Sequence, residues 1–422
     1  MTDLSSTLPE LDSSLESGPW TTRQKAVVAL TASAVIFDGV DIQVVGFAIP
    51  AISQSWNLAK SHFASVLAAG LFGVAVGSAL GGLEGDRLGR RPALILNVFL
   101  FAAATLGMAD AHSLPQLFLL RFIAGLGIGG VLPNAATLTS EFTPLRRRPF
   151  ATTITIVCIP LGGVLAGILA SSLLPAHSWR ALFLVAGLLP LLHGCLLLAF
   201  LPESPSFLLQ KSTNAVRQTS AGRASPAELF RAGFARDTVA LWASFFFCLL
   251  TVYLAFNWLP SILLNTQYAG KEASRALAFH NFGGIFGAIG VGWCIGFRGS
   301  RVPMSVSALV AICSALTLAW LTHGTPASHV VLLAAICIQG AAVNAVQTTL
   351  YALATQLYPT PVRSTGVAFA LAIGRTGAVV SSYLGASLLA LRTSNYFAVA
   401  ACTMCVVLVA MQCIRRHIAP AY

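Results

Sequence analysis

Charge is the scarcest feature of this sequence. Only 9% of its 422 residues are Asp, Glu, Lys or Arg, whereas 56% are hydrophobic. A soluble globular domain carries roughly 25% charged residues, so the composition excludes an ordinary soluble fold, and it equally excludes disordered, collagen-like and disulfide-scaffold chains. The sequence therefore predicts a protein that crosses a membrane several times.

Acidic residues are scarcer than basic ones. The chain has 14 Asp and Glu against 25 Lys and Arg, which gives a formal net charge of +11. In a soluble protein this balance would indicate nucleic acid. In an apolar chain the basic residues are expected in the loops that flank membrane helices. We therefore expect the lipid bilayer as the surroundings of the chain and no nucleic-acid partner.

The sequence also lacks a metal-binding motif and a signal peptide. The nine cysteines fall in apolar stretches, and none has the spacing and polar neighbours of a metal site. The pair Cys402 and Cys405 is expected to pack within the last apolar segment. Residues 1–25 carry acidic residues and lack the positive start of a signal peptide, so the first apolar segment is expected to remain as a spanning helix. No metal and no organic cofactor is predicted.

Twelve apolar segments are long enough to span a bilayer core of about 30 Å, which needs roughly 20 residues per helix. Their predicted limits are 26–52, 61–83, 92–110, 115–139, 149–175, 179–201, 238–265, 273–297, 302–322, 328–355, 362–391 and 395–414. The predicted fold class is an all-α membrane protein with twelve transmembrane helices in two pseudo-symmetric six-helix halves. The predicted parts are an N-terminal tail 1–25, a first bundle 26–202, a central loop 203–237, a second bundle 238–414 and a C-terminal tail 415–422.

The basic residues orient these helices. With the N-terminus inside, eighteen of the 25 Lys and Arg fall in cytoplasmic segments, five on the opposite side and two within helices. The positive-inside rule therefore predicts that both termini are cytoplasmic, and the even number of helices agrees with this.

The two halves look related. At an offset of 215 residues, Pro144 aligns with Pro359 and Arg148 with Arg363, and Gly125 falls on Gly340. Such a short match is weak alone. Together with the division into six and six helices, it indicates an internal duplication.

Ionisable residues inside the predicted helices are candidate functional groups, because each costs about 2.5–3.5 kcal/mol at the centre of a membrane helix. Four occur there: Asp38, Asp41, Arg121 and Arg375. The spacing of Asp38 and Asp41 places both carboxylates on one helix face, about 5–6 Å apart at Cβ. Two carboxylates this close cannot easily both ionise, so one is expected to exchange a proton near neutral pH. Gly39 between them leaves room for a neighbouring helix or a substrate.

The two arginines admit two interpretations each. Arg121 would pair with an aspartate of the first helix and compete with a proton for it, which makes Asp38, Asp41 and Arg121 the predicted proton-coupling set. Arg375 would hold a substrate carboxylate in two-point geometry. In the alternative interpretation, both arginines form static ion pairs with the aspartates across the bundle, and neither contacts substrate.

Uncharged polar residues form a second set of candidates. In segment 328–355 the residues Gln339, Gln347 and Tyr351 follow a four-residue stride, with Asn344 beside them, and Asn257 and Trp258 interrupt an earlier apolar run. Amides and aromatic rings together suit an aromatic anion. Helix packing uses the same groups, so the structural alternative stays open for each. His193 and His280 would either join a proton path or simply be hydrogen bonded.

Several motifs carry a family resemblance. The segment "GGLEGDRLGRRPAL" (81–94) resembles the loop signature of the major facilitator superfamily, and the helix that contains Arg121 and "LPESP" (201–205) resemble two further elements of that family. The resemblance implies the major facilitator fold with alternating access. It also implies that Asp86 and the basic residues Arg87, Arg90 and Arg91 latch the cytoplasmic ends of the two halves.

The resemblance narrows to the aromatic acid:proton symporters, the benzoate, 4-hydroxybenzoate and protocatechuate permeases. It rests on "DGVD" in the first helix, "LPNAATLTSEFTP" (132–144), "NWLP" (257–260), "FGGIFGAIGVGW" (282–293) and "YPTPVRSTGVAFALAIGRTGA" (358–378). It implies that Asp38 and Asp41 are needed for transport and that Glu141 and Arg363 serve the cytoplasmic gating network. Two departures stand out. The second-half loop "GFRGSRVP" (296–303) has no acid, and "IPLGG" (159–163) lacks the glycine before proline found in drug:proton antiporters.

The sequence therefore predicts a carrier, and no enzyme. It would import a small aromatic carboxylate with protons across a bacterial inner membrane, as a monomer. Arg375, Gln339, Asn344, Gln347, Tyr351, Asn257 and Trp258 would bind the substrate. The alternatives are a carrier of another small organic acid, sugar or polyol, and a drug:proton exporter. A membrane sensor or an intramembrane enzyme would need a signalling domain or a catalytic cluster, and neither is apparent.

Overall fold

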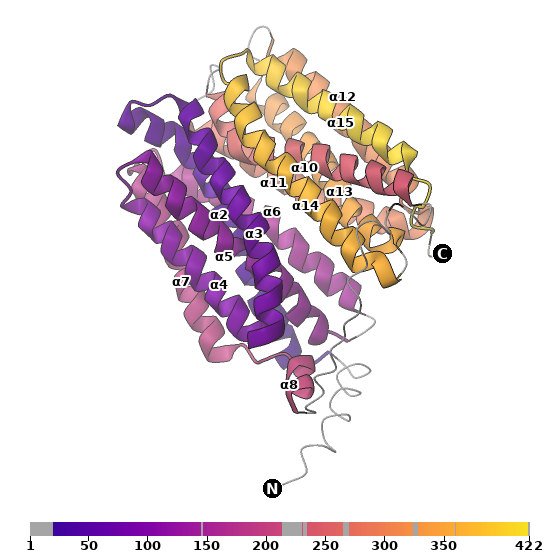
Figure 1. Cartoon of the computed structure of the whole chain (residues 1–422). Helices are drawn as coiled ribbons and strands as arrows, with labels where there is room; N and C mark the ends of the chain where they lie inside the picture. Colours follow the sequence, from indigo (N-terminus) through magenta and orange to yellow (C-terminus); the bar gives the residue numbers. More distant parts are fainter. Residues whose placement is uncertain are drawn as a thin grey trace. The chain divides into compact units, whose positions relative to one another are not determined.

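The structure is a computed structural model that describes residues 20–144, 147–212, 230, 234–264, 270–323, 328–358 and 360–420. Within these ranges, the side chains of residues 149, 150, 152, 153, 209–212, 270, 271 and 360–365 lie outside the description. Figure 1 follows the chain from the N-terminal helices to the C-terminal helices.

The described chain is helical and contains no strand. Its helices are α2 (Thr22–Trp56), η1 (Lys60–Phe63), α3 (Ala64–Leu88), α4 (Arg90–Ala109), α5 (Leu114–Glu141), α6 (Arg148–Leu173), α7 (Trp179–Phe200), α8 (Pro205–Ser212), α10 (Ala235–Leu263), α11 (Gly270–Arg298), α12 (Arg301–Leu321), α13 (His329–Leu357), α14 (Thr360–Leu388) and α15 (Thr393–Cys413). Twelve of these segments are long and apolar enough to cross a membrane. The predicted all-α fold with twelve spans is confirmed.

The limits of the predicted spans move by a few residues at most. The largest difference is at α3, which continues to Leu88 where the sequence predicts an end at 83. Helical hydrogen bonding extends past the hydrocarbon core, whereas apolar composition marks only the part inside it. The short helix α8 lies within the predicted central loop, where its polar residues gave no sign of a helix.

The chain divides into two compact units. Unit 1 comprises Met1–Ile42, Phe72–Gly162 and Arg180–Gln218, and unit 2 comprises Gln43–Leu71, Gly163–Trp179 and Thr219–Tyr422. Unit 1 therefore holds α4, α5, α8 and, from Arg180 onward, α7, with the adjoining parts of α2, α3 and α6. The other parts of these three helices belong to unit 2, together with α10 to α15.

Unit 1 is held together by helix contacts around α5. Helices α4 and α5 pack along their lengths. The amide of Asn134 on α5 donates to the carbonyl oxygen of Gly81 on α3 at 2.9 Å. The hydroxyl groups of Thr31 on α2 and Thr139 on α5 lie 2.8 Å apart. Polar contacts of this kind are common between membrane helices, because no water is present to compete for them.

Unit 2 is built on three main helix pairs: α10 with α14, α11 with α13, and α12 with α15. The second pair packs backbone to backbone, because a Cβ atom at Gly340 would collide with the carbonyl oxygen of His280. The first-half segments of unit 2 join this framework directly. The ammonium group of Lys60 donates to the carbonyl oxygen of Ser261 at 3.4 Å.

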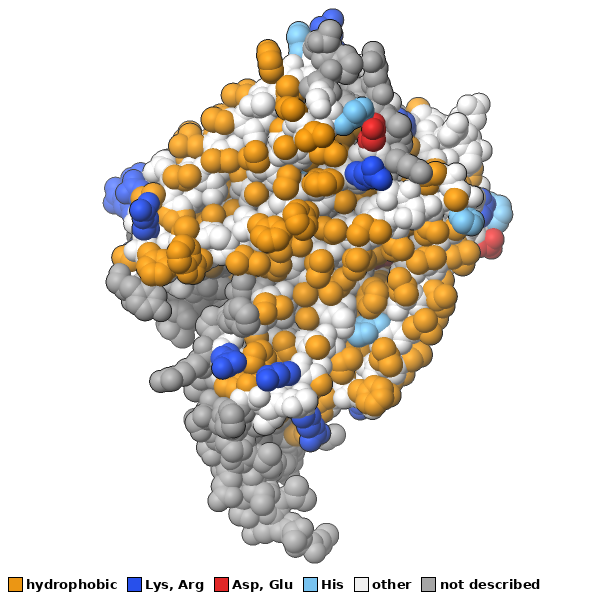
Figure 2. Space-filling view, turned by 180° about the vertical axis from the view of Figure 1, so that it is seen from behind, with side chains coloured by type: hydrophobic (Ala, Val, Ile, Leu, Met, Phe, Trp, Pro, Cys, Tyr) orange, Lys and Arg blue, Asp and Glu red, His pale blue; other side chains and the backbone are white. Residues whose placement is uncertain are grey.

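The surface has the character expected of a membrane protein. Large apolar side chains face outward, including Trp320 with 76% of its surface exposed and Trp293 and Phe200 with 70% each. Figure 2 shows hydrophobic side chains spread over the visible face, with the few charged side chains mostly toward its margins. Exposure on this scale would be costly in water and is stabilising against lipid, so the protein is a multi-pass membrane protein.

Candidate functional site

A buried ion pair lies inside unit 1, on two helices that the bilayer surrounds. The guanidinium Nη1 of Arg121 on α5 donates to Oδ2 of Asp41 on α2 at 2.6 Å. The side chains of Arg121 and Asp41 are only 5% and 0% exposed. The other carboxylate oxygen of Asp41 accepts a hydrogen bond from the hydroxyl of Thr105 on α4. Both oxygens of one carboxylate are therefore bound by other helices of the same unit.

Arg121 is fixed by more than its carboxylate partner. Its Nη1 also donates to the carbonyl oxygen of Asp41 at 3.1 Å, and its Nη2 donates to the carbonyl oxygen of Ile42 at 3.0 Å. A buried pair of charges is better tolerated when further donors are satisfied in this way, although Nε of Arg121 has no partner among the described residues. The predicted pairing of Arg121 with an aspartate of the first helix is confirmed. Its role in proton coupling stays a prediction.

Asp38 lies one helical turn before Asp41 and is 2% exposed. The glycine between the two aspartates is used for helix contact, because a Cβ atom at Gly39 would collide with the carbonyl oxygen of Ile159 on α6. The predicted close approach is therefore made by a neighbouring helix. The two acids share a face of α2 that is closed to water.

A second polar cluster lies in unit 2 around Arg375 of α14. Its Nη1 donates to the phenol oxygen of Tyr253 on α10 at 2.9 Å. The phenol group of Tyr351 on α13 is close enough to Arg375 to interact with its charge, and it is hydrogen bonded to the side chain of Gln347. The ring of Phe245 stands edge-on to Tyr351, with ring centroids 5.4 Å apart. Three helices thus place a guanidinium among aromatic rings and an amide.

The other predicted substrate residues differ in whether they face the cluster around Arg375. Asn257 and Trp258 follow Tyr253 on α10 and are 2% and 0% exposed. The oxygen of Gln339 accepts from the hydroxyl of Ser314 on α12 at 3.5 Å, so this amide faces a different helix from Arg375. The amide of Asn344 donates to the carbonyl oxygen of Gly340 within its own helix at 3.0 Å.

Several polar contacts were not found from the sequence. Thr105 is an isolated polar residue in an apolar helix, and only its placement shows that it contacts a buried charge. Tyr253 interrupts an apolar run in the sequence, but its contact with Arg375 emerges only from the structure. A third contact joins Gln43 on α2 to Asn281 on α11: the two amides exchange hydrogen bonds of 3.3 and 2.7 Å, and both are fully buried. The position of Gln43, two residues after Asp41, was the one signal that could have drawn attention to this pair.

The predicted gating residues of unit 1 form a connected network at one end of the bundle. Arg90 makes an ion pair with Asp86, one turn away. The backbone N–H of Arg91 donates to Oε1 of Glu203 at 3.0 Å.

The same network extends to Glu141. The residue after Glu203, Ser204, donates from its hydroxyl to Glu141. Arg87 is exposed, and the side chain of Arg363 lies outside the described residues. Glu203 was quoted in a sequence motif without a role, and here it joins the loop before α4 to the end of α7.

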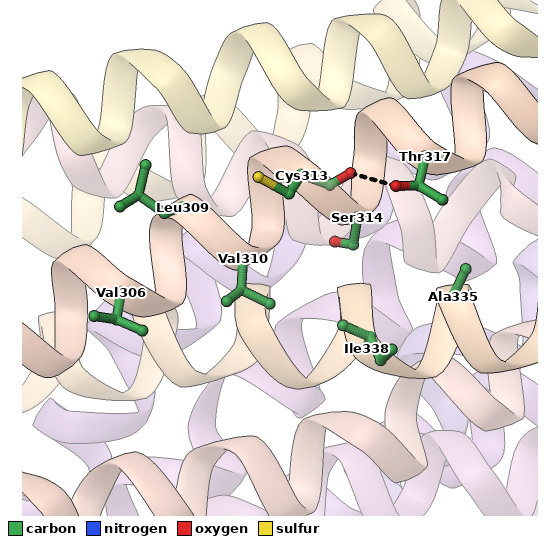
Figure 3. Close-up of a pocket in the computed structure, with 8 residues that line it drawn as sticks. All are labelled: Val306, Leu309, Val310, Cys313, Ser314, Thr317, Ala335 and Ile338. Carbon is green, nitrogen blue, oxygen red and sulfur yellow. Dashed lines mark hydrogen bonds between the residues drawn. The ribbon is translucent and has the colours of Figure 1, made fainter.

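A groove with a cavity volume of about 360 Å³ opens between α12 and α13 of unit 2, and neither Arg375 nor Tyr253 lines it. Figure 3 shows that it is walled mostly by aliphatic side chains such as Val310 and Ile338, with the hydroxyls of Ser314 and Thr317 as its polar groups. It offers no charge to an anion, so it is no candidate for the substrate site. No group of three or more metal-ligating side chains is found among the described residues.

The chain is similar in sequence to known transporters. The sequence profile of the Major Facilitator Superfamily matches residues 31–334. The 4-hydroxybenzoate transporter PcaK of Pseudomonas putida is 32% identical over 407 residues, covering 90% of each chain. The 3-(3-hydroxy-phenyl)propionate transporter of Escherichia coli (strain K12) is 32% identical over 383 residues, again covering 90% of each.

The fold is shared with a solved transporter. The crystal structure of a D-xylose-proton symporter superposes with a TM-score of 0.74 at 19% sequence identity, covering 94% of this chain and 98% of that one. At this identity the likeness concerns the fold alone. The profile match and the relatives at 32% identity together show that this chain is a transporter of the Major Facilitator Superfamily and not an enzyme.

Proposed function

We propose that the protein imports a small aromatic carboxylate together with protons, by alternating access of its two six-helix halves. The observation that carries the proposal is the buried carboxylate of Asp41, which is held by Arg121 and Thr105 inside membrane helices. Ionisable groups in such places are expensive and usually functional. The relatives that transport 4-hydroxybenzoate and 3-(3-hydroxy-phenyl)propionate support the substrate class.

Protons act in this scheme through Asp41 and its neighbour Asp38. When Asp41 takes up a proton it loses its charge, and the ion pair with Arg121 loses its main attraction. The guanidinium then remains bound to two backbone carbonyl groups alone. A proton therefore changes the contacts between α2 and α5, which is the differential interaction that coupling requires.

The substrate acts through the cluster around Arg375. A guanidinium can bind a carboxylate through two parallel hydrogen bonds. The hydroxyl of Tyr253, which accepts from Arg375, is itself able to donate to the same carboxylate. The ring of the substrate would then lie among Tyr351, Phe245 and Gln347. Asn257 and Trp258 would line the same pocket. Gln339 and Asn344 would support the pocket through their contacts with the surrounding helices, without contacting the substrate carboxylate.

The remaining assignments complete the scheme. Asp86, Arg87, Arg90, Arg91, Glu141 and Arg363 would gate the cytoplasmic side. The carrier would work as a monomer in the inner membrane of a bacterium, with both termini in the cytoplasm, as the distribution of basic residues favours.

Uptake by energised cells tests the proposal. Cells that express the protein would be given radiolabelled benzoate, 4-hydroxybenzoate and 3-(3-hydroxyphenyl)propionate, with and without a protonophore. We expect accumulation of at least one of these acids and its collapse to the level of control cells when the proton gradient is dissipated.

Two results would contradict it. Absence of uptake of every aromatic acid, with the protein shown to be in the membrane, would overturn the substrate class. Uptake that a protonophore leaves unchanged would overturn proton coupling. A neutral sugar, supplied in the same assay, serves as the matched control for substrate charge.

A further inference from the structure

Seven buried side-chain polar atoms in unit 2 have no hydrogen-bond partner among the described residues, and two of them lie near Phe256. They are Nδ2 of Asn257 on α10 and Nε2 of His280 on α11. Both side chains are 2% exposed. Buried polar groups are nearly always hydrogen bonded, and in the hydrocarbon region no bulk water is available to substitute. Two such atoms on adjacent helices therefore indicate a site that a small polar group fills.

These atoms lie close to the proposed carboxylate site. Asn257 is four residues after Tyr253, the phenol bound to Arg375, so the two side chains lie on one face of α10 and about 5–6 Å apart at Cβ. The ring of Phe256 links the two positions: its centroid is 5.6 Å from that of Tyr253 and 6.3 Å from that of His280. Both contacts are edge-on, so the rings of Tyr253, Phe256 and His280 form a continuous row.

We propose that Asn257 and His280 bind a hydroxyl group on the ring of the substrate, and that this makes the carrier selective for phenolic acids. The inference rests on the proposed function, in which Arg375 binds the carboxylate. In 4-hydroxybenzoate the carboxylate and the hydroxyl occupy opposite ends of a flat ring. That separation is comparable to the one helical turn between Tyr253 and Asn257.

The chemistry of the two side chains suits a hydroxyl group. The amide of Asn257 is a donor and can supply a hydrogen bond to the phenol oxygen. In the tautomer with the proton on Nδ1, Nε2 of His280 is an acceptor and can take the phenol hydrogen. In the proposed complex one hydroxyl would satisfy both orphaned atoms. A ring without a hydroxyl leaves them unsatisfied, which penalises benzoate relative to its hydroxylated form.

The backbone holds His280 in place for this role. Helix α11 is pressed against α13 where a Cβ atom at Gly340 would strike the carbonyl oxygen of His280. The next residue, Asn281, is fixed by its two hydrogen bonds with Gln43. The imidazole therefore projects from a rigid segment, and a site on a rigid segment discriminates better between ligands.

A competition experiment with matched ligands tests the inference. Uptake of radiolabelled 4-hydroxybenzoate would be inhibited by 4-hydroxybenzoate and by 4-methylbenzoate, which has nearly the same shape without the hydroxyl. In the wild-type protein we expect the hydroxylated acid to bind at least about tenfold more tightly, as the loss of a buried hydrogen bond implies. The ratio of the two inhibition constants is the readout.

Variants of His280 then locate the effect. His280→Leu is expected to reduce the ratio to about one while 4-methylbenzoate still binds, and His280→Gln to keep part of it through its amide. The control is His193→Leu, because His193 is a buried histidine of unit 1 that contacts Ser33 and the carbonyl oxygen of Leu30. Asn257→Leu gives an independent variant if His280→Leu does not reach the membrane.

The outcomes separate the two proposals. Equal inhibition by both acids in the wild-type protein, or an unchanged ratio in His280→Leu and Asn257→Leu, would overturn the inference and would mean that these atoms bind water alone. The import of aromatic acids would stand in that case. Failure of the wild-type protein to bind any aromatic acid would instead overturn the proposed function.

Discussion

The two units contain equivalent features but stabilise them with different chemical groups. Each has an arginine within a membrane helix, buried in unit 1 and half-buried in unit 2. Each also has a tight turn between membrane helices at a glycine with positive φ: Gly89 at +108° in unit 1 and Gly299 at +69° in unit 2. In unit 1 carboxylates hold both features, since Asp41 binds Arg121 and Glu203 binds the backbone N–H of Arg91 just after the turn.

In unit 2 neutral groups take these places. Arg375 donates to the phenol of Tyr253, and the residue after Gly299, Ser300, exchanges hydrogen bonds with Ile418 of the C-terminal segment. A carboxylate neutralises the charge of an arginine and can be protonated, whereas a phenol does neither near neutral pH. We therefore propose that unit 1 responds to protons and that unit 2 attracts the anion.

The largest effect is expected at the carboxylate of unit 1. In Asp41→Asn the amide cannot exchange a proton, and Arg121 becomes an uncompensated buried charge, which costs about 3–5 kcal/mol of interaction. Because each step of about 1.4 kcal/mol corresponds to a factor of ten, we expect proton-driven accumulation to fall about 100-fold or more. The measurement is uptake by energised cells, with the amount of protein in the membrane determined in parallel.

Asp110→Asn is the matched control, because Asp110 is exposed just after α4. It is expected to transport like the wild-type protein. Exchange of labelled for unlabelled substrate across vesicles needs no net movement of protons, and it should survive in Asp41→Asn better than accumulation does. Accumulation at the wild-type level in this variant would break the assignment of protons to unit 1.

The second effect concerns the arginine of unit 2. Arg375→Gln removes the charge that would pair with the substrate carboxylate, and truncating one partner of a buried charge pair typically costs about 2–5 kcal/mol of binding. We expect the affinity for aromatic acids to fall by at least about 30-fold. Arg375→Lys should lie between, because a lysine keeps the charge without the planar two-point geometry.

Comparing uptake of aromatic acids with uptake of a neutral sugar distinguishes a loss of substrate binding from a loss of folded protein in these variants. Arg392→Gln, at an exposed residue before α15, is the control for loss of a basic side chain. A selective loss for acids, with an unchanged amount of protein in the membrane, supports the comparison. An equal loss in Arg375→Gln and Arg375→Lys, accompanied by poor membrane insertion, would show that Arg375 is needed for folding instead.

The sequence predicted the fold well because the bilayer imposes a simple rule. Twenty apolar residues are needed to cross it, so hydropathy places each helix to within a few residues. It also predicted the pairing of Arg121, since so few ionisable residues occur inside the helices that the possible partners were limited. Helix α8 was missed because a short helix outside the bilayer, with polar and apolar residues mixed, obeys no such rule.

The uncharged part of the site could not be predicted in the same way. Gln339 and Gln347 fit one stride along α13, yet Gln339 bonds to Ser314 on α12 while Gln347 bonds to Tyr351. Which neighbour a polar side chain meets depends on the rotation of two helices about their axes, and that rotation is set by packing and not by hydropathy. For the same reason Thr105 was indistinguishable from other threonines.

A smaller effect is expected at the two turns. Glu203 accepts hydrogen bonds from the backbone N–H groups of Arg91 and Ser204 at 3.0 and 2.8 Å. Ser300 makes neutral hydrogen bonds to Ile418, both at 2.9 Å. Hydrogen bonds to a charged group contribute about 1.5–3 kcal/mol and neutral ones about 0.5–1.5 kcal/mol. Thermal unfolding of purified Glu203→Ala should therefore show a larger loss of stability than Ser300→Ala, and the reverse order would contradict the comparison at the turns.

The smallest effect is a pH dependence of the C-terminal segment. Nδ1 of His417 lies 3.2 Å from the hydroxyl of Ser300. Burial, and then the nearby charge of Arg301, hold the pKa of His417 below its ordinary value, although Asp237 acts in the opposite direction. A histidine with a lowered pKa contributes stability that is present above the unfolded value, about 6.5, and is lost as the pH falls through the folded value.

Acidification should therefore loosen the turn at Gly299 and leave the turn at Gly89 unaffected. The measurement is the difference in unfolding temperature between the wild-type protein and His417→Asn, followed from pH 7.5 to about pH 5, because the subtraction cancels every other group that titrates. The difference should change in favour of the variant as the pH falls, by less than the effect of Glu203→Ala, since His417 is only half-buried. A constant difference across this range would mean that the C-terminal segment holds its turn without regard to the charge of His417, and the two turns would then differ only in the charge of Glu203.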